Sequence, residues 1–200
     1  MSRAISAARG SPANPADPAW LRQLAAFPPG LQAQVRALIE QGRLADYLAQ
    51  RYPERHQIVS DRALFDYVQG FRQRHLRNAA PLDRVCYDAK LRVLQHALGT
   101  HTRASQAQGS RLKTRREIRV ASLFREAPAD FLRMIVAHEL AHLKELEHNK
   151  AFYALCHHMA PDYAQLEFDL RLYLIALDLQ RATQAQTAAA GAVDAGEVPR

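Results

Sequence analysis

The chemistry of this chain is concentrated in the segment His138-Glu139-Leu140-Ala141-His142, which has the H-E-x-x-H pattern. Residues i and i+4 of a helix share one face, so His138 and His142 can present ring nitrogens to one metal ion. Glu139 lies about 100° further round the helix, where its carboxylate can accept a proton from water at that metal. The pattern is typical of zinc-dependent hydrolases, and it predicts Zn²⁺ as cofactor and Glu139 as the catalytic base.

A catalytic zinc site needs three protein ligands besides water, and two downstream residues compete for the third position. His148 can ligate only if the helix ends near Leu146 and the chain turns back, because a continuous helix would carry it about 15 Å from the first histidine. Metzincins have the same spacing but turn at a glycine, where this chain has Glu145. Glu167 is the alternative, since gluzincins take a glutamate from a downstream helix. We predict His148.

Two further features bear on this ligand set. The stretch 147–149 can make the turn if Asn149 adopts the left-handed conformation that ends many helices. Ligand imidazoles are usually oriented by a hydrogen bond from their other ring nitrogen. The candidate carboxylates for that role are Asp162, Glu167 and Asp169.

The composition, 48% hydrophobic and 24% charged over 200 residues, is typical of a globular protein with one sizeable core. The two cysteines, Cys86 and Cys156, form no C-x-x-C pair, which argues against a disulfide framework and a cysteine-based zinc site. The N-terminus shows no apolar signal segment, and no run approaches the roughly 18 apolar residues of a membrane span. We therefore expect a cytoplasmic protein without a membrane-spanning segment.

The net charge of +7 is partly concentrated in the stretch 103–125, where seven Arg or Lys residues accompany a single acid, Glu117. Such a stretch is either a solvated basic surface or a binding surface for nucleic acid or a nucleotide. The sequence leaves both interpretations open.

Apolar spacing predicts an α+β fold that begins with a helical region at residues 19–80. The helices expected there cover about 20–27, 31–48 with a break at Gly42, and 61–71 behind a cap at Ser60 or Asp61. The polar, small-residue segments 1–18 and 183–200 are predicted to be disordered.

Residues 81–182 are expected to form a zincin-like metallohydrolase domain, with a small antiparallel sheet against the H-E-x-x-H helix. The elements expected there are strands at 85–87, 91–94 and 117–124, the first two as a hairpin, a helix at 130–147 capped by Asp130, a short helix capped by Asn149, and a final helix after Asp162.

The run from His138 to Glu145, followed by His148 to Tyr153, resembles the YgjP-like metallopeptidase family and is similar to SprT-like and WLM domains. These share H-E-L-x-H, a histidine six residues on, and an aromatic pair soon afterwards. The resemblance covers about residues 115–160, and the N-terminal third has no counterpart in it. It implies a zincin-like fold with His138, His142 and His148 as metal ligands, Glu139 as catalytic residue and Phe152 packed beneath the site.

The sequence therefore predicts a zinc-dependent metallopeptidase that acts on a peptide or protein, aligned along the edge of the strand at 118–124. Two other functions stay open. One is a metal-dependent hydrolase of a nucleotide or another phosphoanhydride, suggested by the basic stretch 103–125. The other is a DNA-associated SprT/WLM-like protease.

Overall fold

The computed structural model of the chain describes residues 18–79, 81–91 and 116–194. Most of the strand predicted at 91–94, the basic residues from 103 to 115 and the disorder predicted at 1–17 and 195–200 lie outside the described residues. The chain divides into two compact units, one of residues 52–167 and one combining the residues up to 51 with those from 168 onward.

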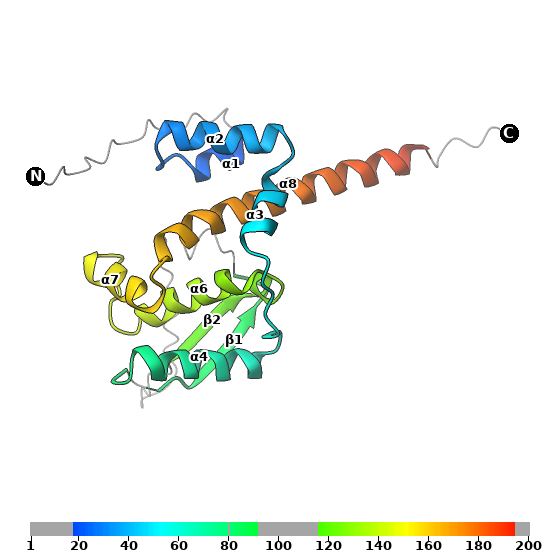
Figure 1. Cartoon of the computed structure of the whole chain (residues 1–200). Helices are drawn as coiled ribbons and strands as arrows, with labels where there is room; N and C mark the ends of the chain where they lie inside the picture. The colour runs from blue at the N-terminus through cyan, green and yellow to red at the C-terminus, as the bar shows by residue number, and fades with distance from the viewer. Residues whose placement is uncertain (1–17, 80, 92–115, 195–200) are drawn as a thin grey trace, which may run out of the picture. The chain divides into compact units, whose positions relative to one another are not determined.

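The 52–167 unit contains the H-E-x-x-H segment and a two-stranded sheet (Figure 1). Its elements are α4 (Asp61–His75), β1 (Arg84–Asp88), β2 (Glu117–Ala121), the 3₁₀ turn η1 (Ser122–Arg125), α6 (Ala129–Ala141), α7 (Lys150–Met159) and the first residues of α8 (Tyr163–Asp194).

The two strands pair in parallel, with Arg84 opposite Glu117 and Asp88 opposite Ala121. The antiparallel sheet predicted from the sequence is therefore wrong for this pair. A parallel pair needs a crossover connection of about a dozen residues or more, and the segment between Asp88 and Glu117 is longer than that. The 88–90 stretch, expected to be a hairpin turn, instead bends locally as the Lys90 amide donates to the Asp88 carboxylate.

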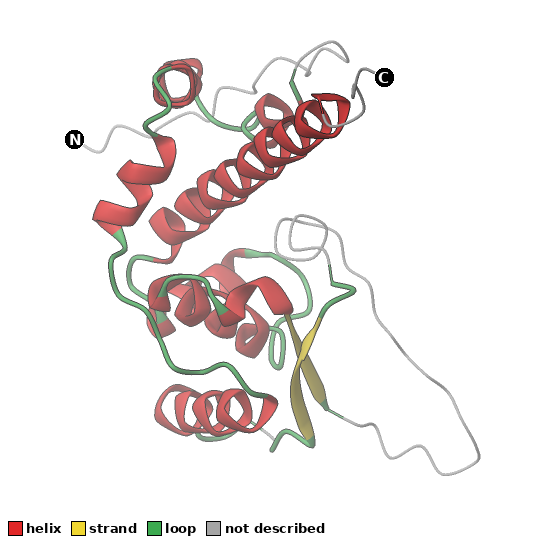
Figure 2. Ribbon diagram, turned by 90° about the vertical axis from the view of Figure 1, so that its right-hand side faces the viewer, coloured by secondary structure: helices red, strands yellow, loops and turns green. Residues whose placement is uncertain are grey.

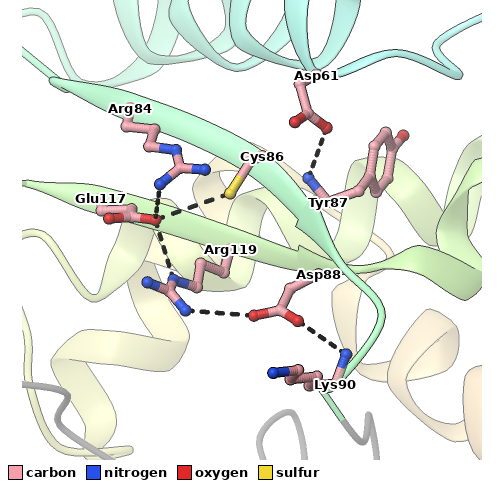
Figure 3. Close-up of polar contacts among 8 residues, drawn as sticks. All are labelled: Asp61, Arg84, Cys86, Tyr87, Asp88, Lys90, Glu117 and Arg119. Carbon is pink, nitrogen blue, oxygen red and sulfur yellow. Dashed lines mark hydrogen bonds and ion pairs between the residues drawn. The ribbon is translucent and has the colours of Figure 1, made fainter.

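Helices α4 and α6 lie on the same side of this sheet (Figure 2). Side chains alternate along a strand, so one face of the sheet is apolar and the other polar. The buried face carries Val85, Tyr87, Ile118 and Val120. The other face carries the contacts of Figure 3, in which Glu117 forms an ion pair with Arg84 and accepts a hydrogen bond from Arg119, and Arg119 also contacts Asp88.

Helix caps explain where the elements of this unit begin. Ser60 caps α4 as predicted, since its hydroxyl accepts from the Ala63 amide, and the neighbouring Asp61 accepts from the Tyr87 amide at the edge of β1. Asp130 does not cap α6: the N-cap is Pro128, and Asp130 lies in the first turn. Of the helices in the predicted helical region 19–80, α4 belongs to the unit that contains the sheet.

The other unit consists of α1 (Ala19–Gln23), α2 (Pro29–Glu40), α3 (Leu44–Arg51) and the larger part of α8. Gly42 makes the predicted break between α2 and α3, with a φ of 68° that glycine adopts without strain. Phe27 meets Phe168 edge to face, and Arg51 pairs with the fully buried Asp169 at 3.0 Å.

Helix α8 continues to Asp194, so the disorder predicted from residue 183 is wrong up to that point. The segment is rich in alanine and glutamine, both strong helix formers. The α+β class is confirmed. No helix within the described residues has both the length and the apolar character needed to cross a bilayer.

Candidate metal centre

Helix α6 brings His138 and His142 to its C-terminal end. The α-helix stops at Ala141, several residues before the predicted end, and His142 is its C-cap. The next turn tightens, because the Leu143 and Lys144 amides donate to carbonyls three residues back. This early stop allows the chain to bring His148 back toward the helix.

The turn that follows needs neither glycine nor a left-handed residue. No described non-glycine residue has a positive φ. Asn149 is extended, with φ −89° and ψ −177°, and its side chain caps α7 by accepting from the Phe152 amide at 2.9 Å. The predicted cap role of Asn149 is confirmed, whereas a left-handed turn at this residue is wrong.

Three imidazoles converge at the end of α6. The Nε2 atom of His138 lies 3.2 Å from that of His142 and 3.3 Å from that of His148. Tetrahedral ligands about 2.0–2.1 Å from zinc lie about 3.3 Å from one another, so the spacing fits this ion. Within the described part of the chain, these residues form a group suited to metal binding, and Glu167 does not belong to it.

The Nδ1 atoms of His138 and His142 are hydrogen-bonded to groups that the sequence did not suggest. His142 Nδ1 lies 3.0 Å from the Glu145 carbonyl, which can only accept, so the ring proton sits on Nδ1 and the lone pair on Nε2. His138 Nδ1 lies 2.7 Å from the Tyr163 hydroxyl. Of the predicted carboxylates, Asp162 binds Arg133 instead.

Phe152 forms the base of the histidine group, as the family resemblance implied. It is fully buried, and its ring centroid lies 5.0 Å from His138, 4.5 Å from His142 and 4.6 Å from His148. Phe152 lies in the first turn of α7, where its amide donates to the capping side chain of Asn149. One side chain therefore packs against all three imidazoles.

Glu139 is half-buried on α6 beside the first histidine. Burial raises the pKa of its carboxyl to about 7, because the charged form loses its hydration. A divalent cation next to it would favour the carboxylate again. The group is thus placed to hold or release a proton near neutral pH.

The described part of the basic stretch is largely neutralised within the fold. Arg119 contacts both Glu117 and Asp88 (Figure 3), and the pKa of Asp88 is lowered by the Lys90 amide and by Arg119. Arg125 donates to the Val59 carbonyl and lies over the Tyr87 ring. These arginines serve as structural contacts, which favours the interpretation as a solvated basic surface here.

A helix-borne H-E-x-x-H segment with three converging imidazoles defines a zinc-dependent metallohydrolase. The chain belongs to the YgjP-like family, whose profile, described as "YgjP-like, metallopeptidase domain", matches residues 29–173. This confirms the predicted zincin-like fold and zinc cofactor. The match also includes α2, α3 and α4, so the expectation that the N-terminal third lacks a counterpart is wrong.

A curated relative is 57% identical over 159 residues, which cover 80% of this chain and 95% of that protein: UTP pyrophosphatase of Escherichia coli (strain K12). No solved structure matches the chain significantly.

If Phe152 sets the spacing of the imidazoles, replacing it should weaken zinc binding beyond its effect on folding. We expect Phe152→Leu to cost less than the about 3–5 kcal/mol typical of Phe→Ala and to reduce the rise in melting temperature that zinc produces. The matched control is Phe131→Leu, a fully buried position on the same helix as His138. Equal zinc-induced rises in the two variants would contradict the role of Phe152.

Proposed function

We propose that the chain is a zinc-dependent hydrolase that releases pyrophosphate from a nucleoside triphosphate, with UTP as the first substrate to test. The observation that carries this proposal is the 57% identity to a protein named UTP pyrophosphatase, over 95% of that protein's length. Identity at this level over nearly a whole chain favours a shared reaction.

In this proposal His138, His142 and His148 hold the zinc, and Glu139 is the general base. Zinc bound there supplies Lewis acidity and makes a water molecule acidic near neutral pH. The imidazoles bind through Nε2, with the Nδ1 proton of His142 donated to Glu145. The Glu139 carboxylate takes the proton from the attacking water, a role typically worth about 10²–10⁴-fold in rate.

The reaction adds one water across a phosphoanhydride. The water oxygen bonds to phosphorus, the bond from that phosphorus to the bridging oxygen breaks, and pyrophosphate leaves with the nucleoside monophosphate as the second product. The proton taken by Glu139 returns to the leaving group or to solvent. Peptide hydrolysis by H-E-x-x-H enzymes needs the same base, so the motif by itself fits both reactions.

Two exposed hydrophobic residues close to His148 in the sequence support a substrate with a nucleobase. Three large hydrophobic residues of the described chain are exposed, and two of them flank His148 in sequence: Leu146, 54% exposed, and Tyr153, 38% exposed. The Tyr153 ring lies 6.4 Å from the His148 ring. Exposed apolar groups near a reactive centre typically mark ligand contacts, and a tyrosine face can stack on a base.

Peptide hydrolysis is the second candidate function. The family description names a metallopeptidase domain. Within the described residues β2 pairs with β1 only, and an open strand edge is where an extended peptide can add by backbone hydrogen bonds.

The zinc content of the purified chain tests the three-histidine site. We expect the purified chain to hold about one zinc ion per molecule, as a three-histidine catalytic site implies. His148→Ala should reduce affinity by more than the about 10–100-fold typical of losing an outer partner of a ligand. Elemental mass spectrometry after dialysis measures this. Glu167→Ala and the exposed His158→Ala are controls that should keep the metal, and zinc loss with Glu167→Ala alone would refute the three-histidine site.

The products formed from UTP test the proposed reaction. Zinc-loaded protein should convert UTP to UMP and pyrophosphate, and Glu139→Gln should keep zinc but lose about 10²–10⁴-fold in kcat. Ion-exchange chromatography identifies the products, with a fluorogenic peptide library run in parallel. Peptide cleavage that depends on Glu139, without UTP turnover, would replace the proposal with the metallopeptidase function.

Replacement of Tyr153 tests the recognition of the nucleobase. Base–aromatic stacking is worth about 1–3 kcal/mol, so Tyr153→Ser should raise the KM for UTP by about 5- to 150-fold. Hydrolysis of inorganic tripolyphosphate, which has no base, should change little. Val59→Ser, at the third exposed hydrophobic position, is the control. A parallel loss on both substrates at unchanged zinc content would show that Tyr153 does not recognise the base.

A further inference from the structure

The contact between His138 and Tyr163 is buried from solvent. The hydroxyl oxygen of Tyr163 lies 2.7 Å from Nδ1 of His138, and the exposed fraction is only 2% for His138 and 1% for Tyr163. The rings are also nearly parallel, at 17° with centroids 6.4 Å apart. A hydrogen bond in such surroundings is strengthened by the low dielectric and is costly to leave unmade.

The direction of this hydrogen bond follows from metal binding. A ring nitrogen that binds a metal must offer its lone pair, so a neutral His138 bound through Nε2 carries its proton on Nδ1. The Tyr163 oxygen therefore accepts from Nδ1 and must donate its own proton elsewhere. Cys156 is hydrogen-bonded to that hydroxyl, and burial raises the pKa of its thiol to about 12, so it is a neutral partner.

A second contact fixes the position of Tyr163. Arg133, on α6 with His138, donates to both carboxylate oxygens of Asp162 at 2.9 Å each. Asp162 immediately precedes Tyr163, the first residue of α8. Hydrogen bonding by Arg133 lowers the pKa of Asp162, so the pair stays ionised at neutral pH. The start of α8 is thus held to α6 by two contacts: the Arg133–Asp162 ion pair and the hydrogen bond between His138 and Tyr163.

We infer that Tyr163 is the positioning residue of the metal centre: its hydroxyl fixes His138 with the proton on Nδ1 and Nε2 turned to the metal, while the Arg133–Asp162 pair holds Tyr163 in place. The inference rests on the proposed metal-binding role of His138 and not on the identity of the substrate. His142 differs, because its acceptor is a backbone carbonyl that substitution leaves in place.

The test compares two Tyr→Phe variants that each remove one hydroxyl hydrogen bond from a buried ring. Tyr163→Phe should weaken zinc binding about 10–100-fold, the usual effect of losing the partner of a ligand imidazole. Tyr87→Phe, which loses a bond from its hydroxyl to the Ile58 carbonyl, should leave zinc affinity unchanged. Competition with a chromophoric zinc chelator measures both, and equal affinities in the two variants would overturn the inference.

A spectroscopic measurement separates positioning from a general loss of structure. In the zinc-loaded parent protein, long-range ¹H–¹⁵N spectra should show His138 protonated at Nδ1, with the proton protected from exchange. Tyr163→Phe should leave that proton exchanging fast. A parent protein with His138 protonated at Nε2 would overturn the inference directly.

Two outcomes remain to be distinguished. If Tyr163→Phe fails to fold without metal by circular dichroism, Asp162→Asn at the half-exposed ion pair replaces it, and an unchanged zinc affinity there would also refute the arrangement. Tight zinc binding that depends on Tyr163, without UTP hydrolysis, would overturn the proposed function alone. UTP hydrolysis with zinc affinity insensitive to Tyr163 would overturn this inference alone.

Discussion

The metal centre depends on one unfavourable arrangement: the Nε2 atom of His138 is held 3.2 Å from that of His142 and 3.3 Å from that of His148. Lone pairs repel at that distance unless a cation or a proton lies between them, so the fold must hold the rings until a metal arrives. The early end of α6, the Phe152 ring beneath the three imidazoles and the Glu145 carbonyl at His142 supply that restraint. All of them lie within ten residues of the motif in the sequence.

Local features were predictable from the sequence because local chemistry determines them. Ser60 and Asn149 cap their helices through their own side chains, and Gly42 breaks a helix because it accepts a positive φ. The convergence of His148 on the motif was predictable from spacing, although the route of the chain was not: the sequence suggested a left-handed Asn149, and the structure uses a tightened helix end.

The features that the sequence did not suggest depend on contacts between distant segments. The parallel pairing of β1 with β2 joins segments far apart in the sequence, and it leaves no residue pattern in either strand that separates it from antiparallel pairing. Tyr163 follows the motif by more than twenty positions and stands among apolar helix residues, where a tyrosine is most simply assigned to the core. A ligand imidazole can donate to a tyrosine hydroxyl or a backbone carbonyl as well as to a carboxylate, and neither of these acceptors is marked by a sequence pattern.

The same constraint explains why the motif alone does not identify the substrate. A metal, a water and a half-buried Glu139 can activate attack on a carbonyl carbon or on phosphorus, because the proton to be removed belongs to the water in both reactions. Discrimination must come from groups outside the ligand set that meet the rest of the substrate. The groups proposed for this role are Leu146 and Tyr153, which are exposed on either side of His148 in sequence. Under the proposed nucleotide hydrolysis, this apolar surface would meet the base while the phosphates lie at the metal.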